Sequence, residues 1–448
     1  MKFKIKQGSV TILALLMLLL TACEQEFTNP NNPTEDVVFG SKEGLYALSI
    51  GLNQYYSTTV LRQVIEAPGI STRELGVTNT YLNINELAVG GDALPAESGG
   101  ITNPWVVLLR AKGMAESLIT GIPQVTLTDG TKSGLTAYAN LYKAMCLGGL
   151  IGMFEQTVIN NSPDGDAAFS DRATVLAEII TLLTEAKDAL AANAVSDDFQ
   201  NIVLGADINL AKTVNALLAR YSLIAGSYAA AITHADAVIS DASTPANSVF
   251  NYDANNSNPI WDRTVNSADL DPQLNFGLVA PYLPDAADGR IAFYLGDSTI
   301  TANADAGGQQ LAAMLGFFAT QTTSIPLYLD GEMLLIKAEA NARLSNLTDA
   351  VTNLNLVLQK TDDVFGVNAG LSAWAGEASS QTDILEEIYK NRCIELFLTG
   401  QRLEASRRFH PDLDPNINST TNERNRNYYP YPSIERDNNP NTPADPDI

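Results

Sequence analysis

The apolar residues of this chain recur every three or four positions over most of its length, which is the period of an α-helix with one buried face. Two stretches have this period in two arms that are separated by a turn signal. The first covers residues 208–240 and is interrupted at Gly226-Ser227, and the second covers residues 327–358 and is interrupted at residues 344–346. Because most periodic segments have the helical period, the sequence predicts a mainly α-helical chain that contains helical hairpins.

The two predicted hairpins resemble each other and the tetratricopeptide repeat. Small residues recur where two antiparallel helices must approach closely: Ala219 and Ala231 in the first hairpin, Ala338 and Ala350 in the second. Each copy alone is also compatible with a generic helical hairpin. Since such a unit cannot bury its faces by itself, we expect several of them to stack into an α/α superhelix.

Further helices are predicted on both sides of the first hairpin and near the carboxy terminus. One begins after Ser41 as N-cap and another after Ser170-Asp171. The others cover Trp105–Ile122, Leu135–Phe154 and Asp383–Phe409, and the last has Asp383 and Glu386 in capping-box register. Trp105 is expected in the core. The tetratricopeptide-type helices should thus occupy residues 105–240 and 327–409 of one domain, residues 41–448.

Three stretches lack helical periodicity. Residues 75–103 contain five glycines, and residues 241–323 form a long insertion rich in Asn, Asp and Pro. Long irregular insertions in a compact helical body usually carry function. The tail, residues 424–448, contains five prolines and is not expected to be helical.

The first residues have the pattern of an export signal. Three lysines lie within the first six residues, and an apolar run covers residues 10–20. The sequence Leu20-Thr21-Ala22-Cys23 resembles a bacterial lipobox, so we expect a signal peptide over residues 1–22 and a lipidated Cys23; the alternative is an ordinary signal peptide. Residues 23–40 would then form a tether, and Glu24 and Glu26 resemble the acidic signals that send lipoproteins to the cell surface.

Composition excludes several classes of function. The chain has 448 residues, 45% of them apolar, so it can bury a sizeable core, and its formal net charge of −24 makes nucleic acid a poor partner. It has only two histidines, His234 and His410, so a multi-histidine zinc site is not expected. Cys146 and Cys393 are interpreted as buried free thiols, with a disulfide between them as the alternative.

The sharpest signal lies in the carboxy-terminal third. Residues 392–402 read RCIELFLTGQR, which resembles the R-x-x-E-L-x-x-E-G-x-R helix of the SusD/RagB family. The matching positions include Arg392, Glu395, Gly400 and Arg402. Thr399 replaces a Glu of the family pattern, and Leu403-Glu404-Ala405 stands where the family has two aromatic residues and an Asp. These departures bear on the subfamily and not on the fold.

Other segments resemble the same family in the same order. They are the lipobox, Ala219-Arg220-Tyr221 through Tyr228, Ala338-Glu339-Ala340 through Asn355, and the tail with Tyr429-Pro430-Tyr431-Pro432, Glu435 and Asn439-Pro440. From the residues themselves, Arg392 and Glu395 are spaced to pair along one helix face. Arg402 is expected to anchor the proline-rich tail or a neighbouring loop, so the motif is interpreted as structural.

The resemblance implies a surface lipoprotein of the outer membrane that is not an enzyme. It would bind a nutrient and deliver it to a partner TonB-dependent transporter, the nutrient being an oligo- or polysaccharide or, alternatively, a peptide. A tetratricopeptide scaffold without its own ligand and a lipid-anchored glycoside hydrolase are the competing hypotheses. For the hydrolase, Asp285, Asp288 and Arg290 could suggest acid/base work, but Asp288-Gly289-Arg290 is interpreted as a structural turn.

Glycan binding needs flat aromatic faces beside planar polar groups. Trp261 in the long insertion is the first candidate, and Tyr81 with Asn83 and its neighbouring asparagines is the second. Trp374 and Tyr294 are weaker candidates, and core packing is the alternative for each of these aromatic residues. No cofactor and no metal is predicted, although Asp164-Gly165-Asp166 could hold a casual surface calcium ion.

Overall fold

The computed structural model describes residues 40–241, 243, 247–297, 300–302, 309–376, 379–415 and 423–448. The predicted signal peptide, Cys23 and nearly all of the tether lie outside the described residues. Within them, no helix combines the length and the apolar character that crossing a bilayer would require.

The elements of the amino-terminal half are mostly long helices. They are α3 (Lys42–Tyr55), η2 (Tyr56–Val60), α4 (Leu61–Ser71), β1 (Leu75–Val77), α5 (Leu82–Val89), η3 (Gly91–Ala93), α6 (Gly99–Gly121), η4 (Ile122–Gln124), α7 (Asp129–Met153), β2 (Thr157–Val158), β3 (Phe169–Ser170), α8 (Arg172–Ala192), α9 (Asp197–Phe199) and η5 (Gln200–Leu204).

The carboxy-terminal half alternates hairpins with shorter pieces. They are α10 (Leu210–Ile224), α11 (Tyr228–Ile239), β4 (Val249–Phe250), α12 (Pro259–Trp261), η6 (Asp262–Asn266), β5 (Leu270–Pro272), η7 (Leu274–Gly277), α13 (Gly289–Tyr294), β6 (Ile300–Thr301), β7 (Gln310–Leu311), η9 (Gly316–Phe318), β8 (Ile325–Pro326), α14 (Asp330–Arg343), α15 (Leu347–Leu358), α16 (Gln381–Glu395), α17 (Arg402–Phe409) and α18 (Ser433–Asn438).

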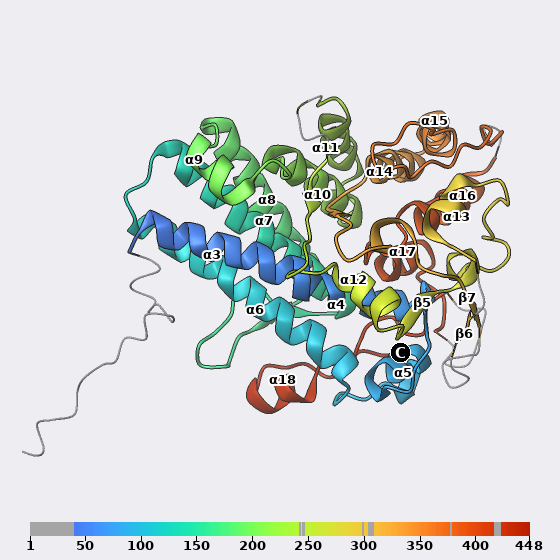
Figure 1. Ribbon diagram of the computed structural model, residues 1–448, viewed down its shortest axis with the longest axis horizontal. Helices are drawn as coiled ribbons and strands as arrows, with labels where there is room; N and C mark the ends of the chain where they lie inside the picture. Colours follow the sequence, from blue (N-terminus) through green and yellow to red (C-terminus); the bar gives the residue numbers. More distant parts are fainter. Residues whose placement is uncertain are drawn as a thin grey trace, which may run out of the picture.

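The long helices stack as successive antiparallel pairs, which confirms the predicted mainly α architecture. α6 packs on α7 and α7 on α8; α10 pairs with α11, α14 with α15, and α11 and α14 join the two predicted hairpins (Figure 1). Both hairpins turn where predicted, and Ser41 and Asp171 cap α3 and α8 through their side-chain oxygens. The small residues Ala216, Ala231, Ala235 and Ala340 lie in one buried cluster between the hairpins.

The predicted single helix over residues 383–409 is wrong. The chain forms α16 and α17 with a turn between them, in which Leu398 and Gly400 have φ values of 53° and 77°. A Cβ at Gly400 would lie 2.5 Å from the carbonyl oxygen of Val64, so this turn needs both the left-handed conformation and the missing side chain. The capping box also differs, since Ser380 and Asp383 form it.

Two further expectations need correction. The tail contains the short helix α18, and the glycine-rich stretch 75–103 contains α5 and the start of α6. Other expectations are confirmed: Trp105 is a core residue with 1% of its surface exposed, and its indole Nε1 donates to Glu435 at 2.9 Å. Cys146 and Cys393 are buried free thiols.

A buried ion-pair network holds the motif helix α16 to the long insertion. Arg290 of α13 is fully buried and donates to both oxygens of Asp288, at 2.9 and 2.6 Å, and to Glu395 at 3.1 Å. Lys360 also pairs with Glu395. The Asp288-Gly289-Arg290 turn is therefore structural, as predicted. The expected pairing of Arg392 with Glu395 is wrong, because Glu395 takes these two partners and Arg392 faces Glu339 instead.

Replacing Arg290→Met should destabilise the fold strongly, because buried Asp288 would lose its ion-pair partner and buried Glu395 would keep only Lys360. We expect the free energy of unfolding to fall by about 3 to 5 kcal/mol, measured by urea denaturation. Arg436→Met is the matched control, since Arg436 pairs with Asp445 at the surface, and it should change stability by less than about 1 kcal/mol. Equal effects of the two substitutions would contradict the role of the network.

His410 joins the end of α17 to two carboxylates. Its Nδ1 lies 2.8 Å from Glu423 and its Nε2 lies 3.2 Å from Glu386, while Tyr389 and Tyr282 donate to the same two carboxylates. Burial alone would lower the pKa of His410, but the hydrogen bonds and charges of Glu423 and Glu386 outweigh it and raise the pKa. The protonated imidazole is therefore favoured by folding.

This raised pKa predicts a pH-dependent contribution to stability. The contribution is fully present below the unfolded-state pKa of about 6.5 and is lost as the pH rises through the folded-state pKa of His410. The difference in free energy of unfolding between the wild type and His410→Gln should therefore be larger at pH 6 than at pH 9. A pH-independent difference would show that the imidazole acts only by packing.

Candidate functional site

The two-stranded sheet β1–β5 brings two segments of the chain together that lie almost two hundred positions apart. Leu75 pairs with Pro272 and Val77 with Leu270 in antiparallel register. Beyond this sheet the backbone N–H of Thr78 donates to the carbonyl of Asp269 at 3.0 Å. The sheet thus places the segment after β1 against the segment before β5, and we call residues 78–83 with residues 261–269 the loop platform.

Polar side chains tie the two segments of the loop platform to each other. The Asn79 amide donates to the Asp269 carboxylate, and its side-chain oxygen accepts the backbone N–H of Tyr81 at 2.9 Å. Arg263 pairs with Asp269 and with Glu66 of α4, the latter at 3.2 Å. Asp269 is buried and the side chain of Arg263 is only 11% exposed. These contacts therefore order the loop that carries Tyr81, and the half-buried amide of Asn79 is the polar group that lies beside this residue.

Apolar side chains on the loop platform remain open to solvent. Tyr81 is 57% exposed and Leu82 is 72% exposed, although they lie at the beginning of α5. Val265 of η6 is exposed as well. An exposed aromatic ring beside fixed polar groups is the arrangement that stacking on a sugar ring requires.

Trp261 lies on the same platform, at the end of the short helix α12. The side chain of Asn258 caps this helix: its oxygen accepts the backbone N–H of Trp261 at 3.0 Å, and its amide donates to the carbonyls of Phe317 and Thr323. Asn258 is fully buried, so the backbone of Trp261 is held firmly, while the indole is half-buried. Asn83 is also half-buried and packs beside Gly99 at the start of α6.

The structure does not bring the other two aromatic candidates to the loop platform. Trp374 follows α15, where its backbone exchanges hydrogen bonds with the side chain of Asn355, and its ring packs against a buried cluster. α15 and α5 lie at opposite edges of the molecule (Figure 1). Tyr294 has no exposed surface, and its hydroxyl donates to the carbonyl of Glu395 at 3.3 Å. Its burial contradicts the prediction of a ligand contact, because a stacking platform needs an exposed face.

The motif residues of α16 and α17 have structural contacts. Arg402 is buried and donates to the carbonyl of Phe276, which confirms that it anchors a neighbouring loop. Glu395 belongs to the buried network described above, and Gly400 forms the left-handed turn between the helices. Arg392 is buried between α14 and α17.

Sequence reasoning missed the partners that complete the platform, namely Arg263, Asp269 and Glu66. They could not be found from periodicity, because β1 and β5 have only three residues each. Asp271 of β5 was missed too. It is buried opposite Gly76, and burial raises the pKa of its carboxyl to about 7. Part of the Asp271 population is therefore protonated near neutral pH.

Neither a metal centre nor a catalytic carboxylate pair emerges from the parts of the chain that the structure describes. No group of three or more His, Cys, Asp or Glu side chains is arranged there to hold a metal ion. Asp164 and Asp166 lie on an exposed turn. Asp288 is engaged with Arg290 as described, so it is not placed for acid/base chemistry.

Comparisons with known proteins agree with the helical fold described above. The model of the SusD family matches residues 318–445. Among solved structures, a SusD homolog from Bacteroides thetaiotaomicron has a TM-score of 0.69 at 12% identity, covering 93% of this chain and 99% of its own. No curated protein matches the chain.

Two further similar structures carry names that mention a ligand. A SusD-like carbohydrate binding protein from Bacteroides vulgatus has a TM-score of 0.58 at 17% identity, covering 81% of this chain and 83% of its own. A putative sugar binding protein from the same organism has a TM-score of 0.62 at 18% identity, covering 90% and 98%. At these identities the likeness shows the fold, and the SusD family model matches the carboxy-terminal part of the chain, which contains the motif helices α16 and α17.

Proposed function

We propose that the protein binds an oligo- or polysaccharide on the loop platform and hands it to a TonB-dependent transporter while a lipid on Cys23 anchors it to the outer membrane. The observation that carries the binding site is the β1–β5 pairing, which holds exposed Tyr81 on a loop that Asn79, Asp269 and Arg263 fix in place. An exposed aromatic face on a fixed loop suits stacking on a pyranose ring. The named sugar-binding relatives support this choice of ligand.

A binding role is favoured over catalysis by the state of the carboxylates. Asp269 is paired with Arg263, and Asp288 and Glu395 are buried around Arg290. A glycosidase needs an acid and a second carboxylate flanking the scissile bond. On the platform, Asp269 is instead buried in an ion pair with Arg263, so it serves to hold the loop and is not placed as a catalytic carboxylate.

Peptide cargo is the second candidate. The two exposed side chains Tyr81 and Leu82 favour it, because adjacent apolar groups suit peptide side chains as well as sugar faces. Affinity electrophoresis against a panel of polysaccharides, followed by calorimetry with an unstructured peptide mixture, separates the two cargoes.

Tyr81→Ala should weaken binding of the retarding polysaccharide by about three- to tenfold, because it removes the stacking face without touching the core. Trp261→Ala is expected to have a similar effect. Calorimetry of the purified variants measures both affinities. Ile434→Ala is the control, since Ile434 is 52% exposed on α18 and lies off the platform. Unchanged affinity in both platform variants, with a binding parent, would refute the assigned site.

Cys23→Ala should move the protein from the outer-membrane fraction to the soluble fraction, because the thiol that carries the lipid is lost. Fractionation with immunodetection measures the distribution, and mass spectrometry detects the acyl group on the parent. Ser9→Ala in the same leader is the control and should stay membrane-bound. Retention of the Cys23→Ala protein in the membrane fraction would contradict the lipid anchor.

A further inference from the structure

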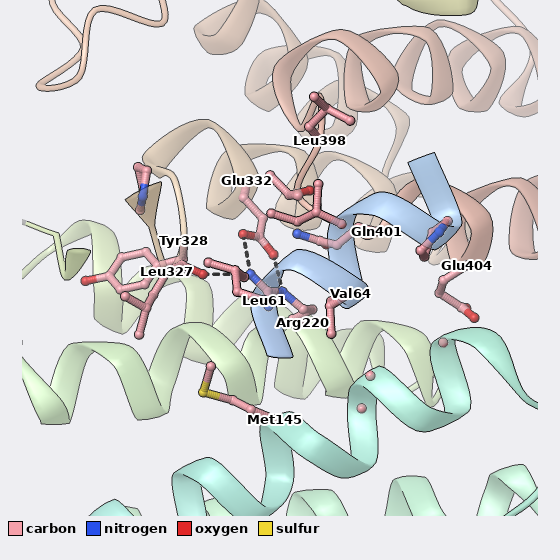
Figure 2. Close-up of a pocket in the computed structure, with 18 of the residues that line it drawn as sticks. Leu61, Val64, Met145, Arg220, Leu327, Tyr328, Glu332, Leu398, Gln401 and Glu404 are labelled. Atoms are coloured by element: carbon pink, nitrogen blue, oxygen red, sulfur yellow. Dashed lines mark hydrogen bonds and ion pairs between the residues drawn. The ribbon is translucent and has the colours of Figure 1, made fainter. Parts of the chain in front are cut away.

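The fold encloses an interior cavity between α4, α7, α10, α14 and the turn from α16 to α17. Its space for water-sized molecules is about 120 Å³, which approaches the cavity of about 150 Å³ that takes up benzene in an engineered protein. Leu61, Val64, Met145, Leu327 and Leu398 give it apolar walls (Figure 2). The cavity can therefore hold a molecule of about six non-hydrogen atoms.

One side of the cavity is polar. Arg220 donates through Nε and Nη2 to the two oxygens of Glu332, at 2.6 and 2.8 Å, and also to the carbonyl of Leu327 (Figure 2). The amide of Gln401 points into the cavity toward Glu332 (Figure 2), yet its Nε2 is buried and has no hydrogen-bond partner. The cavity thus contains a donor that the protein itself leaves unused.

Arg392, which also lines the cavity, carries further unused donors. It is only 4% exposed, and its Nε and Nη1 have no hydrogen-bond partner. Its neighbouring carboxylate is that of Glu339, whose Oε2 lies 3.8 Å from the Nε of Arg392. Arg408 donates to both oxygens of Glu339, at 2.8 and 2.9 Å, and Arg343 donates to one of them at 2.9 Å. Arg392 is therefore a third guanidinium beside a carboxylate that already accepts three shorter hydrogen bonds from two other arginines.

The other arginines that line the cavity have carboxylates of their own. Arg172 pairs with Glu404, and Arg220 and Arg408 are paired as described. The lining is consequently one anion short. Burial lowers the pKa of Arg392 to about 10; Glu339 and Glu332 oppose this effect and Arg408 adds to it. Arg392 is still a cation at neutral pH, so a buried charge stands beside an apolar cavity with only the long 3.8 Å ion pair to Glu339.

We propose that the interior cavity binds a small organic monocarboxylate, with the carboxylate on Arg392 and Gln401 and the hydrocarbon part against the apolar walls. A guanidinium presents N–H groups in a fork that matches a carboxylate. Inorganic phosphate is a poorer match, because it demands donors on every side and most of this wall is apolar. The cavity is lined by residues outside the loop platform. The tests of this proposal and of the glycan site are therefore independent of each other.

Butyrate is the probe, since it has a carboxylate, a short hydrocarbon chain and six non-hydrogen atoms. Isothermal calorimetry and thermal unfolding of the purified protein should show saturable binding with one site per chain. Butyramide, which has the same shape without the charge, and inorganic phosphate should each bind at least tenfold more weakly. Equal responses to butyrate and butyramide, or to butyrate and phosphate, would overturn the proposal, as would no binding of butyrate.

Two variants locate the site. Arg392→Met removes the unpaired cation while Glu339 keeps Arg408 and Arg343, and it should weaken butyrate binding at least tenfold. Leu61→Phe fills the cavity without changing any charge and should have the same effect, which keeps the test decisive if Arg392→Met does not fold. Unchanged butyrate affinity in either folded variant would show that butyrate binds elsewhere.

Discussion

The Glu395 carboxylate is the interaction on which much of the carboxy-terminal structure depends. It is fully buried and receives Arg290 from the long insertion and Lys360 from the loop after α15. Gly331 of α14 lies so close that a Cβ there would come within 1.8 Å of a carboxylate oxygen. Four separate segments therefore converge on one charge. Since an isolated buried charge is very costly, the segments of Arg290 and Lys360 are held in position by the need to neutralise it, while α14 approaches closely because Gly331 has no side chain.

This convergence explains what the family motif does. Its Arg, Glu and Gly positions do not form a surface site; they set the turn between α16 and α17 and hold the insertion against it. Arg402 acts in the same way through the carbonyl of Phe276, four residues after the end of β5. The motif thus fixes the base from which the β1–β5 sheet and the loop platform extend. A chain can vary its platform loops and keep this base, which agrees with a fold that is shared at low sequence identity.

The sequence was sufficient for the long helices and the turns of the two hairpins, but not for the short helices α5 and α18 or for the break between α16 and α17. The hairpin turns at Gly226 and Ser345 could be read from small and polar residues between two apolar periods. The break at Leu398 could not, because Leu is a good helix former and yet has a left-handed φ in this turn, which packs closely on α4 through Gly400. Likewise Tyr294 and Tyr81 are indistinguishable in a loop-rich sequence. Tyr294 becomes a core residue only because α13 packs onto α16, while Tyr81 stays exposed.

The distribution of charge connects the two binding sites proposed for this protein. Nine of the 27 Lys and Arg residues are buried in the described part of the chain, compared with eight of the 51 Asp and Glu residues. The buried cations and anions nearly cancel, so almost all of the net charge of −24 belongs to residues outside the buried set. An acidic exterior repels anionic polymers and favours neutral glycans on the platform. Around Arg392, the lining of the interior cavity has more positive than negative charge. A small anion that enters the cavity therefore meets a positive charge there, in contrast to the acidic surface.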